Sequence, residues 1–243
     1  MKTIRRILYK ILGLEKYLKL VSFTFIRYIK SGFGKSKHAE LHYLKKIIKD
    51  GFVCIDIGAN LGYYSYFLTK YCGEKGKVYA VEPISLHVKI LKKNVRGKNF
   101  QVFPYALGAE NTTVEMGMPK IDGIIHHGMT KIVHENQNSY EKVFNAEMKI
   151  PDELFGNLGK IDFIKVDIEG YESVVFSNML QVLKKYKPLI QSELSGSKNR
   201  IDVINLLSGI GYKAYILENI FLVEIKKEDV QKYETDFYFV CSQ

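Results

Sequence analysis

The amino-acid sequence predicts a doubly wound α/β domain, in which a mostly parallel sheet carries helices on both faces. The chain has 243 residues, enough for one such domain and an additional N-terminal arm. Residues 52–57 form an apolar run with a single acid, which is typical of a strand buried on both faces. A turn with Gly58 and Gly62 follows, and then a helical pattern from Tyr63 to Tyr71. Because this alternation recurs along the chain, we expect parallel strands joined by right-handed crossovers.

The first 50 residues form the predicted N-terminal arm, and residues 51–243 form the main domain. Apolar side chains recur at spacings of three and four between residues 1 and 30, which predicts one or two basic amphipathic helices broken near Gly13. Such a helix either packs on the domain with a solvated charged face or lies peripherally on an anionic membrane surface. Both interpretations stay open. A connection over residues 31–38 then leads into a helix from Ala39 to Lys49.

The remaining elements follow in the order of repeated strand and helix units. We predict strands at residues 78–81, 100–104, 161–166, 188–193, 212–225 and 237–241. We predict helices at residues 85–95, 171–185 and 201–207. Pro83 ends the second strand because proline cannot donate a ladder hydrogen bond, and Ser85 is the expected N-cap of the helix after it.

Residues 109–150 interrupt this regular order. A strand is expected from Thr112 to Met116, and a long polar run extends from Pro119 to Tyr140. Connections of this length inside a compact domain are usually functional loops. We therefore interpret residues 109–150 as an insertion on the substrate side of the domain.

The charged residues are unevenly distributed along the chain. The formal net charge is +10, and residues 1–50 account for all of it, with 13 Lys and Arg against three acidic residues. Residues 51–243 carry 23 basic and 23 acidic residues. A nucleic-acid enzyme more often surrounds its active-site groove with basic side chains, so we expect no nucleic-acid partner.

The cysteines indicate a reducing compartment. Cys54, Cys72 and Cys241 are odd in number and widely spaced, which is typical of neither a disulfide framework nor a zinc site. We find no apolar run of 18 residues that could span a membrane, and the uncharged run from Leu20 to Ile26 is too short for a secretory signal. We expect a cytoplasmic protein, with the inner membrane face as its alternative location.

Acidic residues gather where the predicted parallel strands end. Four of the five strand ends carry an acid, at Asp56, Glu82, Asp167 with Glu169, and Glu193. In open α/β sheets, ligands bind outside the carboxyl ends of the strands. This concentration suits a ligand with hydroxyl groups, an amine or a positive charge, and disfavours a polyphosphate.

The glycine turn differs from a dinucleotide fingerprint. Gly58 and Gly62 have the spacing GxxxG rather than GxGxxG, and Asp56 before the turn would repel a pyrophosphate. Glu82 lies 20 residues after Gly62, where a carboxylate can accept both ribose hydroxyls of an adenosine. The alternative for Glu82 is an acid that merely caps the helix near Ser85. An adenosine with a sulfonium group fits this pattern, which favours S-adenosylmethionine over NAD.

Four sequence blocks together resemble the FkbM family of S-adenosylmethionine-dependent methyltransferases. The blocks are residues 56–65, 78–83, 106–108 and 161–172. The resemblance implies a Rossmann-like class I methyltransferase with a seven-stranded sheet whose last strand is antiparallel. It also implies O-methylation of a sugar, glycan or small molecule, often in polysaccharide or natural-product pathways.

The resemblance also assigns roles by motif position. It implies that the donor pocket is formed by Asp56, Gly58, Asn60, Gly62, Glu82, Tyr105 and Ala106. Within this set Glu82 would hold the ribose, and the Tyr105-Ala106 pair would lie near the adenine. The turn at residues 167–170 would face the transferred methyl group.

Methyl transfer to a hydroxyl needs a group that accepts the hydroxyl proton, because an alcohol is a poor nucleophile. Asp167 is the first candidate for this base and Glu169 the second. The alternative is that both acids stabilise the N-terminus of the helix that begins near Tyr171.

Two other arrangements could supply the base or orient the hydroxyl. The insertion contains His126, His127 and His134, and histidine titrates near neutral pH. A divalent cation held by Asp167, Glu169 and Glu193 is a metal-assisted version, although no spacing requires it and we expect no metal.

Two alternatives to a methyltransferase remain at this point. One is a nucleotide-linked oxidoreductase on the same scaffold. The other is a non-catalytic module that binds a membrane surface through residues 1–30.

Overall fold

A computed structural model describes residues 2–121, 124–125, 127–133 and 140–241. Its main sheet is built from the strands β1 (Val53–Ile57), β2 (Lys77–Val81), β3 (Phe100–Phe103), β9 (Phe163–Val166), β10 (Leu189–Glu193), β11 (Tyr212–Glu218), β12 (Phe221–Glu224) and β13 (Asp236–Cys241). Within the described residues, these eight strands lie in the order β12-β11-β13-β10-β9-β1-β2-β3. The helix η2 (Lys227–Lys232) precedes β13.

The pairing of the strands confirms the predicted fold class. The five strands from β10 to β3 are parallel, whereas β13 runs antiparallel between β10 and β11. The described sheet has one strand more than the seven implied by the resemblance. The predicted strand at residues 212–225 is in fact the hairpin β11–β12, which turns at Asn219 and Ile220 with positive φ angles of 44° and 69°. This is the doubly wound, mostly parallel α/β fold that the sequence predicts.

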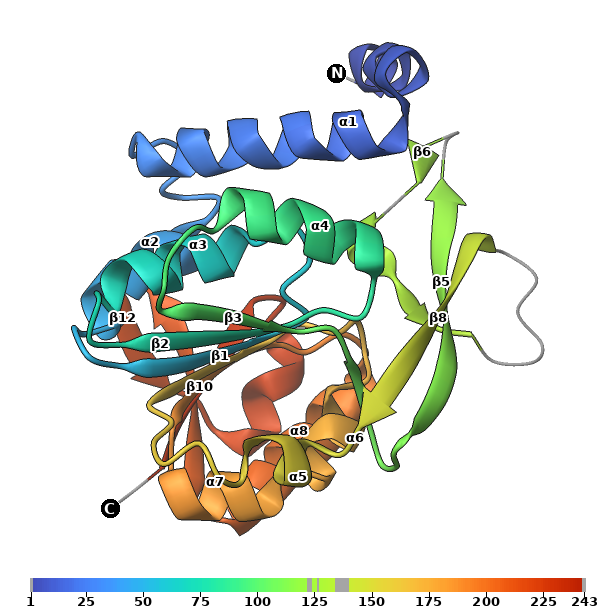
Figure 1. Cartoon of the computed structure of the whole chain (residues 1–243). Helices are drawn as coiled ribbons and strands as arrows, with labels where there is room; N and C mark the ends of the chain where they lie inside the picture. Colours follow the sequence, from blue (N-terminus) through green and yellow to red (C-terminus); the bar gives the residue numbers. More distant parts are fainter. Residues whose placement is uncertain (1, 122–123, 126, 134–139, 242–243) are drawn as a thin grey trace.

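Helices cover both faces of the sheet in two layers (Figure 1). One layer contains α2 (Ala39–Ile47), α3 (Tyr63–Tyr71) and α4 (Ser85–Asn94), and α1 (Lys2–Lys30) packs outside it (Figure 1). The other contains α5 (Pro151–Phe155), α6 (Glu172–Ser177), α7 (Leu180–Tyr186) and α8 (Ser197–Gly209). Alternate residues of the strands serve the two layers: Cys54 packs with the first group of helices and Ile55 with the second. Each strand of the sheet centre is therefore apolar on both faces, as the sequence predicts.

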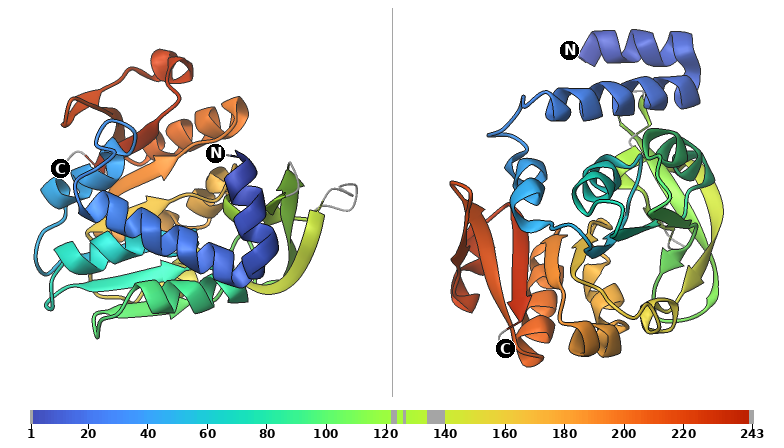
Figure 2. Two further views of the ribbon diagram at one scale, coloured as in Figure 1. Left: turned by 90° about the horizontal axis from the view of Figure 1, so that it is seen from above. Right: turned by 60° about the vertical axis from the view of Figure 1, so that its left-hand side comes forward.

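The long helix α1 is broken at Gly13, as predicted. Gly13 has φ 69° and ψ 169°, a backbone conformation that only glycine adopts easily. The part after the break packs on α3 and α4 through Tyr17 and Leu18. The part before the break continues at an angle and forms the outermost element of the chain (Figure 2).

The insertion forms a second, smaller sheet beside the main one. Its elements are β4 (Ala106–Leu107), β5 (Thr112–Ile121), β6 (Ile124–Ile125), η1 (His127–Met129), β7 (Lys131–Ile132) and β8 (Tyr140–Lys149). β5 and β8 make a long antiparallel hairpin with an irregularity between Met118 and Pro119. The strand expected to end at Met116 therefore continues past the proline, and the polar run contains regular structure.

Two helix predictions need correction. The helix predicted at residues 171–185 is divided into α6 and α7, because the carboxylate of Asp152 accepts hydrogen bonds from the amides of Gln181 and Val182 at 3.1 and 2.9 Å. Asp152 thus starts a new helix there. Ser85 is not a cap: the N-cap position of α4 is Ile84, whose amide donates to the carboxylate of Glu82.

Candidate active site

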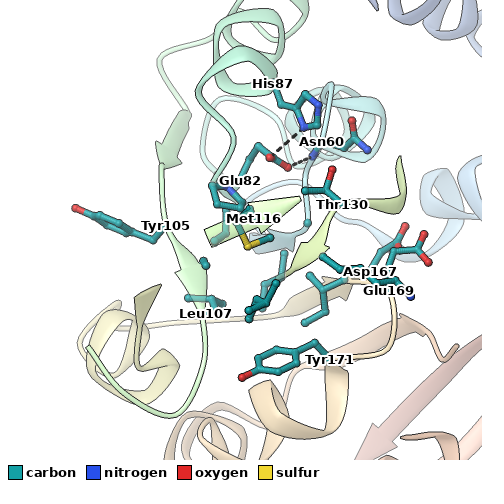
Figure 3. A pocket seen from close by; sticks show the side chains of 18 of the residues that line it. Asn60, Glu82, His87, Tyr105, Leu107, Met116, Thr130, Asp167, Glu169 and Tyr171 are labelled. Carbon is teal, nitrogen blue, oxygen red and sulfur yellow. Dashed lines mark hydrogen bonds and ion pairs between the residues drawn. The ribbon is translucent and has the colours of Figure 1, made fainter. Parts of the chain in front are cut away.

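A cavity of about 250 Å³ opens at the carboxyl ends of β1, β2 and β9 (Figure 3). Seven of the nine predicted site residues line it: Gly58, Asn60, Glu82, Tyr105, Ala106, Asp167 and Glu169. The insertion closes one side of the cavity with Met116 from β5 and with Thr130 and Lys131 around β7. The cavity lies where a doubly wound sheet binds its ligand.

The turn after β1 brings the backbone close to a second turn. Gly58 has a φ of 79°, and a Cβ atom on it would lie 1.8 Å from the carbonyl oxygen of Asp167. The two segments are also joined by a hydrogen bond from the Asp167 amide to the Ile57 carbonyl at 3.0 Å. Glycine is therefore required here both for its positive φ and for the close approach of the turn at residues 167–170.

Glu82 is a buried carboxylate that organises the end of β2. Its Oε2 atom accepts the Asn60 amide at 2.8 Å, and its Oε1 atom accepts the Ile84 amide at 2.9 Å. The Nδ1 atom of His87 lies 3.1 Å from Oε1 (Figure 3). Glu82 thus ties the glycine turn to the start of α4 and faces the cavity at the same time. A carboxylate has about four acceptor positions, so these contacts leave room for a hydroxyl donor.

The other two predicted site residues, Asp56 and Gly62, do not line the cavity. Asp56 points from β1 toward α3, where its carboxylate accepts a hydrogen bond from the Ser65 hydroxyl at 2.6 Å. Gly62 is the N-cap of α3 with a φ of 89°, and a Cβ atom there would lie 2.6 Å from Leu91. Both residues support the turn from behind rather than facing a ligand.

Burial raises the pKa of Asp56 to about 6, although the Ser65 hydroxyl and the positive charge of Lys165 act against the rise. The folded state therefore holds this proton at pH values where the unfolded chain, with a pKa of 3.8, has lost it. By linkage, this carboxyl costs stability as the pH rises from about 4 through about 6. The difference between the two pKa values corresponds to roughly 3 kcal/mol.

We expect Asp56→Asn to gain stability relative to the wild type by roughly 2 to 3 kcal/mol when the pH is raised from 4.5 to 8. The amide keeps an acceptor for Ser65 but carries no charge to bury. Urea unfolding at both pH values measures the change, with the exposed Asp202→Asn as the control. A difference from the wild type that stays the same at both pH values would contradict the assignment.

Asp56 begins a row of polar side chains that crosses four neighbouring strands. Asp56 pairs with Lys165 in the sheet register, Lys165 with Gln191, and Gln191 with Tyr238. All four side chains are buried on the face covered by α2 and α3. Asp236 is the first residue of β13, and its carboxylate accepts hydrogen bonds from Lys165 Nζ at 3.1 Å and from Gln191 Nε2 at 2.6 Å.

Three carboxylates share the edge of the sheet beyond this row. Asp167 and Glu169 lie side by side at one edge of the cavity (Figure 3). Burial raises the pKa of Asp167, and burial with the neighbouring charge of Asp167 raises the pKa of Glu169. The same two causes raise the pKa of Glu193 to about 7. The edge therefore holds carboxyl groups that are more basic than usual.

Glu193 belongs to a second, polar pocket of about 420 Å³ at the ends of β10 and β13. Asp236, Ser195 and Glu40 also line it. Asp167 lines the first cavity and is electrostatically coupled to Glu193 and Asp236 of the second. The charge of Asp167, in the wall of the first cavity, thus affects the protonation of Glu193 in the second.

Several lining residues were not predicted from the sequence. His87, Met116, Thr130 and Lys131 all face the first cavity. The sequence could have predicted that His87 lies near Glu82, since it follows Glu82 by five residues and lies in the first turn of a helix. Tyr105, by contrast, turns its ring away from the cavity and stacks on Phe103, with ring centroids 6.5 Å apart. Its contribution to the cavity wall is therefore not an aromatic face.

The histidines that were predicted as an alternative base lie in the insertion. His126 and His134 lie outside the described residues, and only the backbone of His127 is described. In the described part of the chain, no group of three or more His, Cys, Asp or Glu side chains is arranged to hold a metal ion.

The first cavity suits an adenosine that carries a positive sulfur. The Glu82 carboxylate lies at one part of its wall, and apolar side chains of Leu107, Met116 and Ile168 line another. The backbone turn at Gly58 leaves no space for a side chain at that position. Carboxylates at Asp167 and Glu169 complement a cation and would oppose a pyrophosphate.

Residues 56–215 match a family model described as the methyltransferase FkbM domain. This match covers about two thirds of the chain. No functionally curated protein matches the sequence.

The chain is also similar to several solved structures, three of which are methyltransferases by name. An FkbM methyltransferase from Methylobacillus flagellatus is 16% identical with a TM-score of 0.47, over 83% of this chain and 50% of that one. A precorrin-6y C5,15-methyltransferase from Geobacter metallireducens is 10% identical with a TM-score of 0.48, over 84% and 86%. An S-adenosylmethionine-dependent O-methyltransferase from Thermotoga maritima is 11% identical with a TM-score of 0.45, over 85% and 66%. The chain thus spans half the length of the Methylobacillus protein.

Proposed function

The chain belongs to the FkbM methyltransferase family, whose methyl donor is S-adenosylmethionine, and from this premise we propose that it methylates a hydroxyl group of a sugar, glycan or other small acceptor. The observation that carries the proposal is the position of Asp167. This carboxylate lines the donor cavity and is coupled to the charges of the polar pocket beside it.

The donor would occupy the cavity at the ends of β1, β2 and β9. We propose that Glu82 holds the ribose hydroxyls, since it lines the cavity and its three contacts leave an acceptor position on Oε2 for a hydroxyl donor. Gly58, Asn60 and Ala106 would form the backbone wall around it. Asp56 and Gly62 would act on the donor only through the shape of the turn.

The acceptor would enter from the polar pocket that contains Glu193. Four carboxylates line it (Glu40, Glu193, Glu234 and Asp236) against two cations (Lys37 and Arg200). This excess of acidic side chains disfavours a phosphate or carboxylate on the acceptor and suits a compound rich in hydroxyl groups. A partly protonated Glu193, with a pKa of about 7, can donate or accept a hydrogen bond near neutral pH.

When bound, S-adenosylmethionine supplies a methyl group already activated by its positive sulfur. The chain must then orient the acceptor hydroxyl and take its proton. Asp167 is the proposed base, because its raised pKa makes the carboxylate a stronger base than an ordinary aspartate. Glu169 is the second candidate, and Lys131 lies close enough to influence its charge.

We further propose that the enzyme acts in the cytoplasm, with residues 1–30 in peripheral contact with the inner membrane face. Cys54, Cys72 and Cys241 are free thiols, which supports a reducing compartment. Among the described residues, no helix is long and apolar enough to cross a bilayer.

In isothermal calorimetry we expect the wild type to bind S-adenosylmethionine and to bind neither NAD nor NADP. Preferred binding of a dinucleotide would instead support an oxidoreductase. Glu82→Gln should raise the dissociation constant about 100-fold, because the ribose hydroxyls lose a charged carboxylate as their hydrogen-bond acceptor. The variant should also lose stability, since its amide cannot accept from both the Asn60 and Ile84 amides as the carboxylate does.

A control must separate binding from stability in this experiment. Leu207→Ala removes a buried side chain on α8, away from the cavity, and should destabilise the fold without changing the affinity. Unchanged S-adenosylmethionine affinity in Glu82→Gln would remove Glu82 from the donor site.

A further inference from the structure

The outer face of α1 exposes more apolar surface than its packing explains. Before the break at Gly13, the side chains of Ile4, Ile7 and Ile11 are 62%, 51% and 74% exposed. Their spacings of three and four residues place them on one face of the helix. These three residues form a ridge, here called the isoleucine ridge, that no part of the described chain covers.

The helix does not need this ridge in order to pack on the domain. Leu8, Tyr9 and Leu12, on another face of the same segment, contact the apolar cluster beneath it. Arg5 Nε also donates to the Tyr17 hydroxyl at 3.1 Å, which ties the segments on either side of Gly13 together. The isoleucine ridge is therefore an apolar face in excess of the one that holds the helix in place.

The same surface continues beyond the break. Leu20 and Phe23 are exposed, whereas Leu18 and Ile26 are buried against the domain. Arg27 lies over the Phe23 ring, 5.4 Å from its centre. The exposed apolar residues thus follow the outward side of both segments of α1, which together form the outermost layer of the molecule (Figure 2).

Positive charge surrounds this apolar surface. Exposed Arg6 and Lys10 lie on the same helical segment as the isoleucine ridge, and exposed Lys16 follows the break at Gly13. The first 50 residues carry all of the +10 net charge. Glu15 is the only acid of α1, and it is paired with Lys19 and Lys89. An apolar ridge bordered by lysine and arginine is complementary to an anionic lipid surface.

We propose that α1 docks the protein on an anionic bilayer, with the isoleucine ridge inserted among the lipid headgroups and acyl chains. This deepens the membrane contact proposed above and is independent of the chemistry of methyl transfer. The proposed occupant is a lipid surface, because the charged residues beside the isoleucine ridge are all positive and complement anionic lipid headgroups.

Co-sedimentation of the full-length protein with vesicles tests the proposal. We expect binding to vesicles of phosphatidylcholine with 30% phosphatidylglycerol, and at least about tenfold weaker binding to pure phosphatidylcholine or in 0.5 M salt. The triple variant Ile4→Ser, Ile7→Ser, Ile11→Ser should bind the anionic vesicles at least about tenfold less, because its apolar contact area is lost. The variant Lys10→Glu, Lys16→Glu should lose the preference for anionic lipid.

Matched controls come from exposed isoleucines elsewhere on the chain. Ile201 and Ile220 are 43% and 63% exposed, so the variant Ile201→Ser, Ile220→Ser removes exposed isoleucine surface away from α1 and should bind as the wild type does. All variants should keep the S-adenosylmethionine affinity of the wild type, which separates this test from that of the proposed function. Wild-type binding by the triple isoleucine variant, or no binding by the wild type at low salt, would overturn the proposal. A wild-type dimer that this variant converts to a monomer would also overturn it, in favour of a second copy of the chain.

Discussion

Gly58→Ala is expected to abolish detectable methyl transfer and to weaken S-adenosylmethionine binding by about 100-fold or more. The added methyl group would lie 1.8 Å from the Asp167 carbonyl oxygen, a separation that no structure tolerates. The backbone φ of 79° is also strained for any residue with a side chain. To relieve the overlap, the turn at residues 167–170 must move away from β1, and the cavity wall moves with it.

The control for this variant is Gly159→Ala. Gly159 has nearly the same φ, 77°, but nothing lies within 4 Å of the position of its Cβ. It therefore shares the backbone strain without the collision, and it should lose stability while retaining donor affinity. Calorimetry with both variants measures the difference. Equal affinities would show that the approach of the two turns is irrelevant to the donor site.

Asp167→Asn is expected to reduce the turnover number by about 10²- to 10⁴-fold, the usual contribution of a general base. Donor affinity should stay within a few-fold of the wild type, because the side chain keeps its shape. Glu169→Gln is the comparison, since it removes a neighbouring carboxylate at the same edge of the sheet. Single-turnover kinetics at saturating donor separate the chemical step from binding, once an acceptor has been identified by screening.

The pH profile gives a second measure of the same assignment. The active form of Asp167 is the carboxylate, so turnover should fall as the pH falls through its raised pKa. The fall should therefore begin above the pH range of an ordinary aspartate. If Glu169→Gln loses more turnover than Asp167→Asn does, Glu169 rather than Asp167 is the base.

Local backbone signals account for the parts of the site that the sequence predicts. The turn at Gly58 and the position of Glu82 at the end of the next strand are both properties of short segments. What a short segment cannot show is the direction of a side chain relative to a distant helix. Asp56 was expected at the ligand, but the alternation of side chains along β1 turns it toward Ser65 instead.

The residues that the sequence did not predict depend on partners far along the chain. Lys165 is buried inside a strand, where its charge is paired with Asp236, 71 residues later and 3.1 Å away. Asp152 likewise divides a helix that follows it by almost 30 residues. Met116 and Lys131 reach the cavity through the pairing of β5 and β7, and no sequence period encodes that approach.

The row of Asp56, Lys165, Gln191 and Tyr238 has a consequence for how the chain folds. Strands that are apolar on both faces carry little information about how they should align, because a shifted pairing still buries apolar side chains. A shift of one residue would move Lys165 to the opposite face, among the aliphatic side chains of Ile164 and Val166, and away from Asp236. The free-energy cost of burying an unpaired charge makes this shifted register unfavourable. The polar row thus sets the register of the four central strands. It thereby also sets the positions of their carboxyl ends and of the carboxylates in the site.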